Sequence, residues 1–134
     1  MAEIPDDAKH LFEGTNFAHV ATVNPDGSPQ VSPVWVGLEE DKVVFNTARG
    51  RVKPKNLERD PRVAVSVFNH ENPYESILIQ GRVTETEDDA DLAHINSLSK
   101  RYIGQDEYPF LQEGEQRMIL RIEPEKVAYT PPAG

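Results

Sequence analysis

The stretch Phe17-Ala-His-Val-Ala-Thr-Val-Asn-Pro-Asp-Gly-Ser-Pro-Gln-Val-Ser-Pro-Val-Trp-Val36 decides the fold. Its two ends are rich in valine, threonine and aromatic residues, which favour strands. Asn24-Pro-Asp-Gly27 between them has the residue types of a tight turn. The stretch therefore predicts an antiparallel hairpin with strands over residues 17–23 and 29–36. Pro33 has no N–H to donate to a neighbouring strand, so we expect it at a sheet edge or bulge that faces a ligand or a second subunit.

The chain after this hairpin continues the β pattern. A polar turn at 39–41 leads into residues 42–47, which are predicted as the third strand of a meander. Alternation of residue size predicts strands over 63–68 and 76–86, with Gly81 as a bulge or a point of close approach. Two last strands are predicted over residues 116–122 and 126–130, separated by a break at Glu123-Pro124. Six or seven strands with few helices indicate a mainly β fold, a small antiparallel barrel.

Two segments have helical spacing instead. Residues 4–14 begin with a proline and two aspartates and place Ala8, Leu11 and Phe12 on one face, which predicts a short amphipathic helix. The main helix is predicted over residues 87–102, where an acidic run would form the first turn and Gly104 would close the end. The tail, residues 131–134, is expected to be frayed.

Length and composition limit the classes of protein that fit. The chain has 134 residues, which predicts one domain over 1–134, since domains typically span about 100–200 residues. It has no cysteine, which excludes disulfide scaffolds, thiolate metal sites and cysteine nucleophiles. Its first residues lack the pattern of a signal peptide, and no apolar stretch approaches bilayer length. We therefore expect a soluble, cytoplasmic protein with no membrane partner.

The charge is distributed unevenly along the chain. The net charge is −9, which argues against a general binder of nucleic acid or anionic membranes. Residues 49–62 form a basic island, with six basic and two acidic residues and a net charge of +4, while the rest of the chain carries −13. Because so acidic a remainder repels polyanions, we expect no nucleic-acid partner for this island.

The basic island contains the most specific local feature, Thr47-Ala-Arg-Gly-Arg-Val-Lys-Pro-Lys-Asn-Leu57. It follows a predicted strand and places Pro54 where the first residue of a helix would lie. The N–H groups of Lys55, Asn56 and Leu57 would then face an anion such as a phosphate, with charge-assisted bonds from Arg51 and Lys53. The alternative is a solvated basic loop that pairs with the acidic surface. Composition alone does not exclude either interpretation.

The remaining polar and aromatic candidates have simpler interpretations. The four histidines are spaced too irregularly for a zinc set, and no metal is predicted. Trp35, the only tryptophan, is expected either in ordinary packing or against a planar ligand ring. Tyr102, Tyr108 and Phe110 are expected to pack the main helix and the loop after it, or to cover a substrate pocket.

Several motifs together resemble a known family. They are Gly27-Ser-Pro-Gln-Val-Ser-Pro-Val-Trp35, Phe45-Asn-Thr47, Gly50-Arg-Val-Lys-Pro-Lys-Asn-Leu57, Arg59-Asp-Pro-Arg-Val63, Asn72-Pro-Tyr74 and Gly81-Arg-Val83. In this order they resemble the pyridoxamine 5′-phosphate oxidase-like split-barrel superfamily. Within it, the chain is most similar to the flavin/deazaflavin oxidoreductase group that uses coenzyme F-420. The resemblance covers nearly the whole chain.

This resemblance implies a split β-barrel homodimer with two cofactor sites at the subunit interface. The strand segment Ser32-Pro33-Val34 would line the tricyclic ring of the cofactor. The phosphate-binding pattern of the family maps onto Arg51, Lys53 and Lys55, with Thr47 at the end of the preceding strand and Asn56 as a further contact.

The resemblance leaves two cofactors open, coenzyme F-420 and FMN. Both carry a ribityl phosphate that the basic island could bind. The deazaflavin also carries an anionic oligoglutamate tail, for which Arg49 and Arg59 are available. The pattern Gly50-Arg-x-Lys-x-x-Asn-Leu57 favours coenzyme F-420. The C-terminal arginine and histidine motif of true pyridoxamine phosphate oxidases has no equivalent here, so that activity is not expected.

The implied reaction is transfer of hydride from the reduced deazaflavin to an electron-poor conjugated small molecule, because the cofactor carries the chemistry. The catalytic residues are unknown, with Tyr74 and His70 as weak candidates for the proton donor. Two alternatives stay open: an FMN-binding oxidoreductase of the same fold, and a non-catalytic carrier of a flavin, a deazaflavin or haem.

Overall fold

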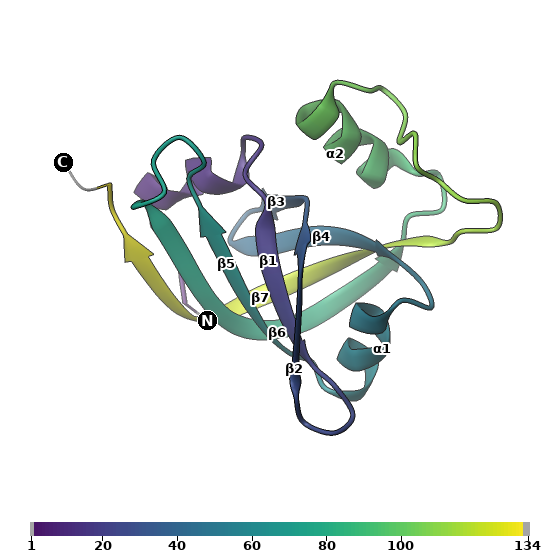
Figure 1. Ribbon diagram of the computed structural model, residues 1–134, viewed down its shortest axis with the longest axis horizontal. Helices are drawn as coiled ribbons and strands as arrows, with labels where there is room; N and C mark the ends of the chain where they lie inside the picture. Colours follow the sequence, from purple (N-terminus) through teal and green to yellow (C-terminus); the bar gives the residue numbers. More distant parts are fainter. Residues whose placement is uncertain (1, 133–134) are drawn as a thin grey trace.

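The structure is a computed structural model that describes residues 2–132, so the last two residues of the predicted frayed tail lie outside the described residues. Seven strands and three helices follow one another along the chain (Figure 1): η1 (Asp6–Phe12), β1 (Ala18–Val23), β2 (Pro29–Val34), β3 (Val36–Glu39), β4 (Lys42–Ala48), α1 (Val52–Arg59), β5 (Arg62–Phe68), β6 (Ser76–Asp88), α2 (Ala93–Ile103) and β7 (Arg117–Thr130).

The strands form one antiparallel sheet in the order β2-β1-β5-β6-β7-β4-β3. β6 and β7 have 13 and 14 residues and run as long curved strands, with η1 near one end and both α-helices near the other (Figure 1). The curled sheet encloses a core of aliphatic side chains together with Phe12 and Phe45. This arrangement confirms the prediction of a mainly β fold, a split antiparallel barrel.

The first hairpin is confirmed, but its second strand is shorter than predicted. β2 pairs with β1 and forms one edge of the sheet, as the missing N–H of Pro33 requires. The predicted strand 29–36 divides at Trp35, and β3 lies at the opposite edge of the sheet. The meander prediction is therefore wrong, since β4 pairs with β3 and β7. Two side chains of α2 bind the backbone just after this division. Tyr102 Oη accepts a hydrogen bond from the N–H of Val36 at 3.0 Å, and Arg101 donates to the carbonyl oxygen of Val36.

Gly81 lies at a bulge, as predicted. The register between β6 and β7 shifts between Gln80 and Gly81, and a Cβ added at Gly81 would lie 2.3 Å from the carbonyl oxygen of Glu123. The predicted break at Glu123-Pro124 is wrong, because β7 runs through it without interruption. Pro124 pairs with Gly81 at this bulge. A proline is tolerated at a bulge, where ladder hydrogen bonding is already interrupted.

The helix predictions are right in place but not in their bounds. Residues 4–14 contain a 3₁₀ helix over Asp6–Phe12 that buries the predicted apolar face. The main helix begins at Ala93, because residues 87–88 pair with β7 and belong to β6. Only part of the predicted acidic run interacts with the start of this helix. The buried carboxylate of Asp89 accepts the N–H groups of His94 at 3.1 Å and Ile95 at 2.8 Å. Gly104 ends the helix with φ 71°.

Candidate functional site

The start of α1 lies close to the edge strand β2. Gly50, with φ 89°, turns the chain after β4, and the helix begins at Val52, two residues before Pro54. The N–H of Lys55 already donates to the carbonyl oxygen of Arg51, so the prediction that Lys55, Asn56 and Leu57 present free N–H groups is wrong. The unpaired N–H groups of the first turn belong to Val52 and Lys53, since Pro54 has none.

Lys53 connects this helix to β2. Its Nζ donates to Ser32 Oγ at 2.5 Å, which brings two predicted site residues into direct contact. The side chain is half-buried, and this burial, followed by the charge of nearby Arg51, lowers the pKa of Lys53. Within residues 2–132, no carboxylate forms an ion pair with Lys53. A partly desolvated ammonium with only a hydroxyl as partner is suited to bind an anion.

Arg51 lies beside the same strand. It lines a cavity of about 170 Å³ together with Pro33 and Val34. Its guanidinium is exposed and lies 3.4 Å from Glu115 Oε1. The structure thus brings five of the eight predicted cofactor-binding residues to one place, where β2 meets the start of α1: Ser32, Pro33, Val34, Arg51 and Lys53.

The other three predicted residues lie elsewhere. Thr47 is buried in β4 opposite Met118. Asn56 is 2% exposed, and its amide donates to Thr22 Oγ1 and Asn24 Oδ1, both at 3.0 Å. That amide holds α1 against β1, and its donors are already used within the chain.

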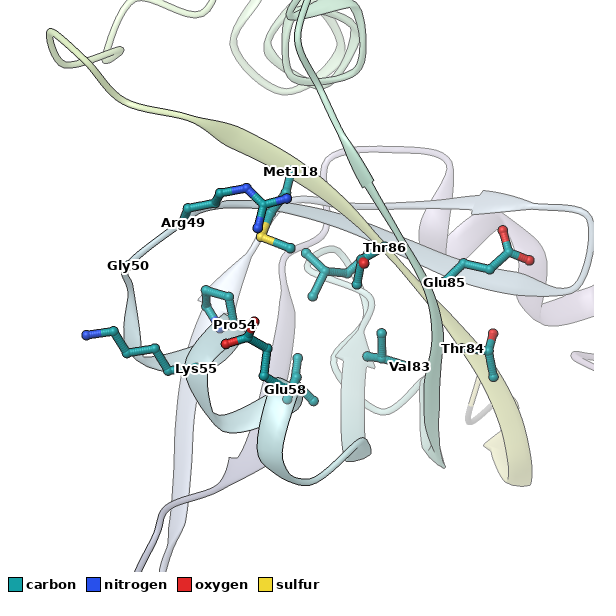
Figure 2. Close-up of a pocket in the computed structure, with 12 residues that line it drawn as sticks. Arg49, Gly50, Pro54, Lys55, Glu58, Val83, Thr84, Glu85, Thr86 and Met118 are labelled. Atoms are coloured by element: carbon teal, nitrogen blue, oxygen red, sulfur yellow. The ribbon is translucent and has the colours of Figure 1, made fainter.

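Lys55 lies on the opposite side of α1. It lines a second cavity, of about 270 Å³, between this helix and the strands β6 and β7. Figure 2 shows its side chain pointing away from the strands, while Glu58 and Met118 line the same cavity. Of the two arginines considered for an anionic tail, Arg49 forms an ion pair with Asp88, and Arg59 donates to the carbonyl oxygen of Val23.

Aromatic side chains form the walls of the cavity beside β2. Trp35 stacks on Tyr102 with ring centroids 5.3 Å apart and meets Tyr108 edge-on at 5.8 Å. Tyr108 in turn meets Phe110 at 5.7 Å. The cavity is lined by Trp35, Tyr108 and Phe110, whereas Tyr102 lies behind Trp35. Trp35 therefore packs against Tyr102 and Tyr108 within the chain, and it also forms part of the cavity wall.

A buried polar network that the sequence analysis did not predict lies behind this wall. Arg117 Nε donates to Asn46 Oδ1 at 2.9 Å, and both residues line the cavity. Asn46 Nδ2 donates to Asp89 Oδ2 at 3.0 Å and lies 2.9 Å from Nδ1 of His94. Burial lowers the pKa of His94 despite the nearby charge of Asp89, so the ring is neutral and its Nδ1 accepts. The available signals were Asn46 within β4 and Arg117 at the first position of β7.

The two candidate proton donors do not line the cavity in this chain. Tyr74 lies in the loop between β5 and β6 and is 74% exposed. His70 Nε2 accepts the N–H of Phe17 at 3.4 Å, and its ring lies edge-on to Phe17. Because Phe17 lines the cavity, His70 lies one residue behind its wall.

No three His, Asp or Glu side chains among residues 2–132 come together as a metal-binding group. No helix in the same range has the length and apolar character needed to cross a membrane.

Comparisons with known proteins place this geometry in a family. The family model described as pyridoxamine 5′-phosphate oxidase matches residues 4–131. A solved structure titled F420 reductase is 30% identical, with a TM-score of 0.83, and the match covers 93% of this chain and 98% of that one. No curated protein sequence matches the chain.

More distant structures share the fold alone. A conserved hypothetical protein from Mycobacterium tuberculosis is 20% identical with a TM-score of 0.76, over 98% of this chain and 86% of that one. The general stress protein 26 from Bacillus anthracis is 21% identical with a TM-score of 0.69, over 96% and 94% of the two chains. Because the family model covers nearly the whole sequence, the chain belongs to the pyridoxamine 5′-phosphate oxidase family.

Proposed function

We propose that this protein is an oxidoreductase that binds coenzyme F-420 and reduces an electron-poor conjugated small molecule. The observation that carries the proposal is the contact of Lys53 with Ser32 near Arg51, which itself lines the aromatic cavity. The 30% identity to a structure titled F420 reductase supports a deazaflavin, while membership of the family is equally compatible with FMN.

The residues at β2 and α1 fit a ribityl phosphate. Arg51 and Lys53 would bind its oxygens by charge-assisted hydrogen bonds, assisted by the Ser32 hydroxyl and the first N–H groups of α1. Pro33 and Val34 would border the ring system along β2, and the cavity that they also line would remain beside the ring for the substrate. Lys55, Thr47 and Asn56 lie outside this group, so we propose no direct phosphate contact for them.

When bound, reduced coenzyme F-420 would supply a hydride from C5. The chain would hold the phosphate and orient the ring along β2, with the aromatic wall beside it. A proton must also reach the substrate, and this chain places neither Tyr74 nor His70 in the cavity. We therefore propose solvent as the proton source.

We also propose that the protein is a homodimer. The outer face of β1, β2, β5 and β6 carries the exposed side chains of Val31 (61%) and Leu78 (54%). Ala21, which pairs with Val31 and with Ala64, and Ser66, which pairs with Leu78, lie between them, and the exposed His19 pairs with Ser66 on the same face. A second copy packed on this face would cover apolar area next to the cofactor strand β2.

Direct binding tests the cofactor assignment. The purified protein is titrated with coenzyme F-420 and, separately, with FMN, and the measurements are repeated with Lys53→Ala and Arg51→Ala. Each variant removes a charged partner of the phosphate, and we expect the dissociation constant to rise about tenfold or more. Lys55→Ala is the matched control, because it removes the same charge from the opposite side of α1. Binding of neither cofactor would overturn the proposal, and binding of FMN alone would replace coenzyme F-420 with FMN.

Turnover separates an enzyme from a carrier. The carrier alternative has one observation in its favour, since neither candidate proton donor lines the cavity. The reduced cofactor is mixed with the protein and a panel of enones and quinones, and reoxidation of the cofactor is followed by its absorbance. An enzyme reoxidises it at a rate proportional to protein concentration. A carrier binds it without changing that rate.

A further inference from the structure

The cavity beside β2 contains a second arginine, Arg117, in addition to Arg51, which the proposed phosphate site uses. Its charged lining residues within the described chain are Arg51 and Arg117, and no carboxylate lines it. Both guanidiniums contact the same acid: Glu115 Oε1 lies 3.4 Å from Arg51, and Glu115 Oε2 lies 3.4 Å from Arg117. Two positive charges therefore share one negative charge, and the cavity attracts anions.

Arg117 is the more deeply placed of the two. Its side chain is only 4% exposed, and three neighbours fix its orientation: Nε donates to Asn46, Nη1 faces Glu115, and the Tyr108 ring lies 5.1 Å from the guanidinium carbon. A guanidinium held in this way has lost its rotational freedom before any ligand arrives, which favours geometric recognition of a planar partner.

One amino group of Arg117 has hydrogen-bonding capacity left. Nη2 makes no hydrogen bond within residues 2–132, and no buried side-chain nitrogen or oxygen in that range lacks a partner. This group is therefore reachable from solvent-filled space. Arg117 lines the aromatic cavity and also a second cavity, to which Asp88, Asp89 and Glu115 contribute.

The rest of the lining is flat and apolar. Trp35, Tyr108 and Phe110 form aromatic walls, and Ile95 and Leu98 of α2 add aliphatic surface. Such walls favour a planar unsaturated ligand, because aromatic faces pack against flat π systems. A ligand that fits this cavity would therefore have an anionic group for Arg117 at one end and a planar apolar body for the aromatic walls at the other. A conjugated carboxylate has both features.

We propose that this cavity binds a small α,β-unsaturated carboxylic acid, whose carboxylate pairs with Arg117. The role of this acid as substrate rests on the proposed function. In that reaction a hydride adds to the β-carbon and a proton from water adds to the α-carbon. The double bond becomes a single bond, the carboxylate is unchanged, and the reductant is the reduced deazaflavin.

Trp35 allows the binding step to be tested without turnover. It is the only tryptophan and it lines the cavity, so its fluorescence reports occupancy there. The full chain, without cofactor and again loaded with coenzyme F-420, is titrated with cyclohex-1-ene-1-carboxylate. Cyclohex-1-ene-1-carboxamide serves as the neutral probe of the same shape. We expect a saturable change with the acid and binding of the amide weaker by about tenfold or more.

Two substitutions assign the effect to the guanidinium. Arg117→Lys keeps the charge but loses the planar fork, and we expect acid affinity to fall several-fold, toward that of the amide. In Arg117→Gln the preference for acid over amide should disappear. Lys55→Ala should leave both affinities unchanged. Circular dichroism establishes whether each variant is folded, and the acid-to-amide ratio of the unmodified protein remains decisive if neither Arg117 variant folds.

The outcomes separate this proposal from the proposed function. Equal affinity for acid and amide in a protein that binds coenzyme F-420 overturns the carboxylate site alone. Acid-selective binding in a protein that binds neither cofactor overturns the proposed function and leaves the site in place. A folded Arg117→Lys variant that loses coenzyme F-420 as strongly as Lys53→Ala would assign Arg117 to the cofactor phosphate, and would also overturn the carboxylate site.

Discussion

Lys53 illustrates how a single residue can lower the stability of the folded chain and at the same time favour the binding of an anion. Its ammonium is half-buried, and its only hydrogen-bond partner within residues 2–132 is the neutral hydroxyl of Ser32. Burial of a charge without a counterion costs free energy, which explains why the pKa of Lys53 is lowered. A bound anion would remove that cost.

This reasoning predicts opposite effects of Lys53→Met on stability and on binding. Without ligand, we expect the free energy of unfolding to stay within about 0.5 kcal/mol of the unmodified protein or to increase. Inorganic phosphate at ten times its dissociation constant should add about 1.4 kcal/mol to the unmodified protein and nothing to the variant. Urea unfolding with and without phosphate measures both. Equal stabilisation of the two proteins would contradict the assignment of Lys53 as an anion ligand.

At the scale of secondary-structure elements, Glu75 joins three parts of the chain. This buried carboxylate, in the loop before β6, lies 3.0 Å from His10 of η1 and accepts hydrogen bonds from Tyr129 of β7 at 2.6 Å and from Asn69 at 3.0 Å. Burial acts to raise the pKa of Glu75, but these hydrogen bonds outweigh it and the pKa is lowered. The hydrogen bond to Glu75, together with burial, raises the pKa of Tyr129 to about 12.

The pH dependence of stability follows from the Tyr129 hydroxyl. Its folded pKa lies above the usual value of 10, so its contribution is fully present below pH 10 and is lost as pH rises toward 12. We expect the free energy of unfolding to fall over this window and to fall less in Tyr129→Phe. Tyr74→Phe is the matched control, because Tyr74 is exposed. Urea unfolding at several pH values measures the slopes, and parallel slopes for all three proteins would exclude this role for Tyr129.

At the scale of the whole molecule, local patterns predicted most elements but not their long-range pairing. The hairpin, the Gly81 bulge and the buried face of η1 depend on residues that are close together in the sequence, so local patterns could predict them. The division at Trp35 depends on Arg101 and Tyr102, more than sixty residues away. The same limit applies to the site. Ser32 and Lys53 were predicted through a motif, whereas Arg117 gains its position only from pairing between β4 and β7.

The last prediction concerns assembly. If the outer face of β1, β2, β5 and β6 is a dimer interface, a charge placed on that face should separate the copies. Leu78→Lys places an ammonium on an exposed apolar position of that face, opposite Ser66 and Ala128. We expect sedimentation to show a dimer for the unmodified protein and a folded monomer for the variant. Ile103→Lys is the control, because it exposes the same new charge on α2.

The cofactor affinity of that monomer tests whether one chain makes a complete site. Ser32 and Lys53 are unchanged in Leu78→Lys, so phosphate contacts from this chain are retained. If the second copy supplies part of the ring pocket, we expect the affinity for coenzyme F-420 to fall by about tenfold or more while Ile103→Lys binds normally. A monomeric unmodified protein that binds the cofactor tightly would contradict the interface. It would also assign the whole pocket to β2, α1 and the aromatic wall of a single chain.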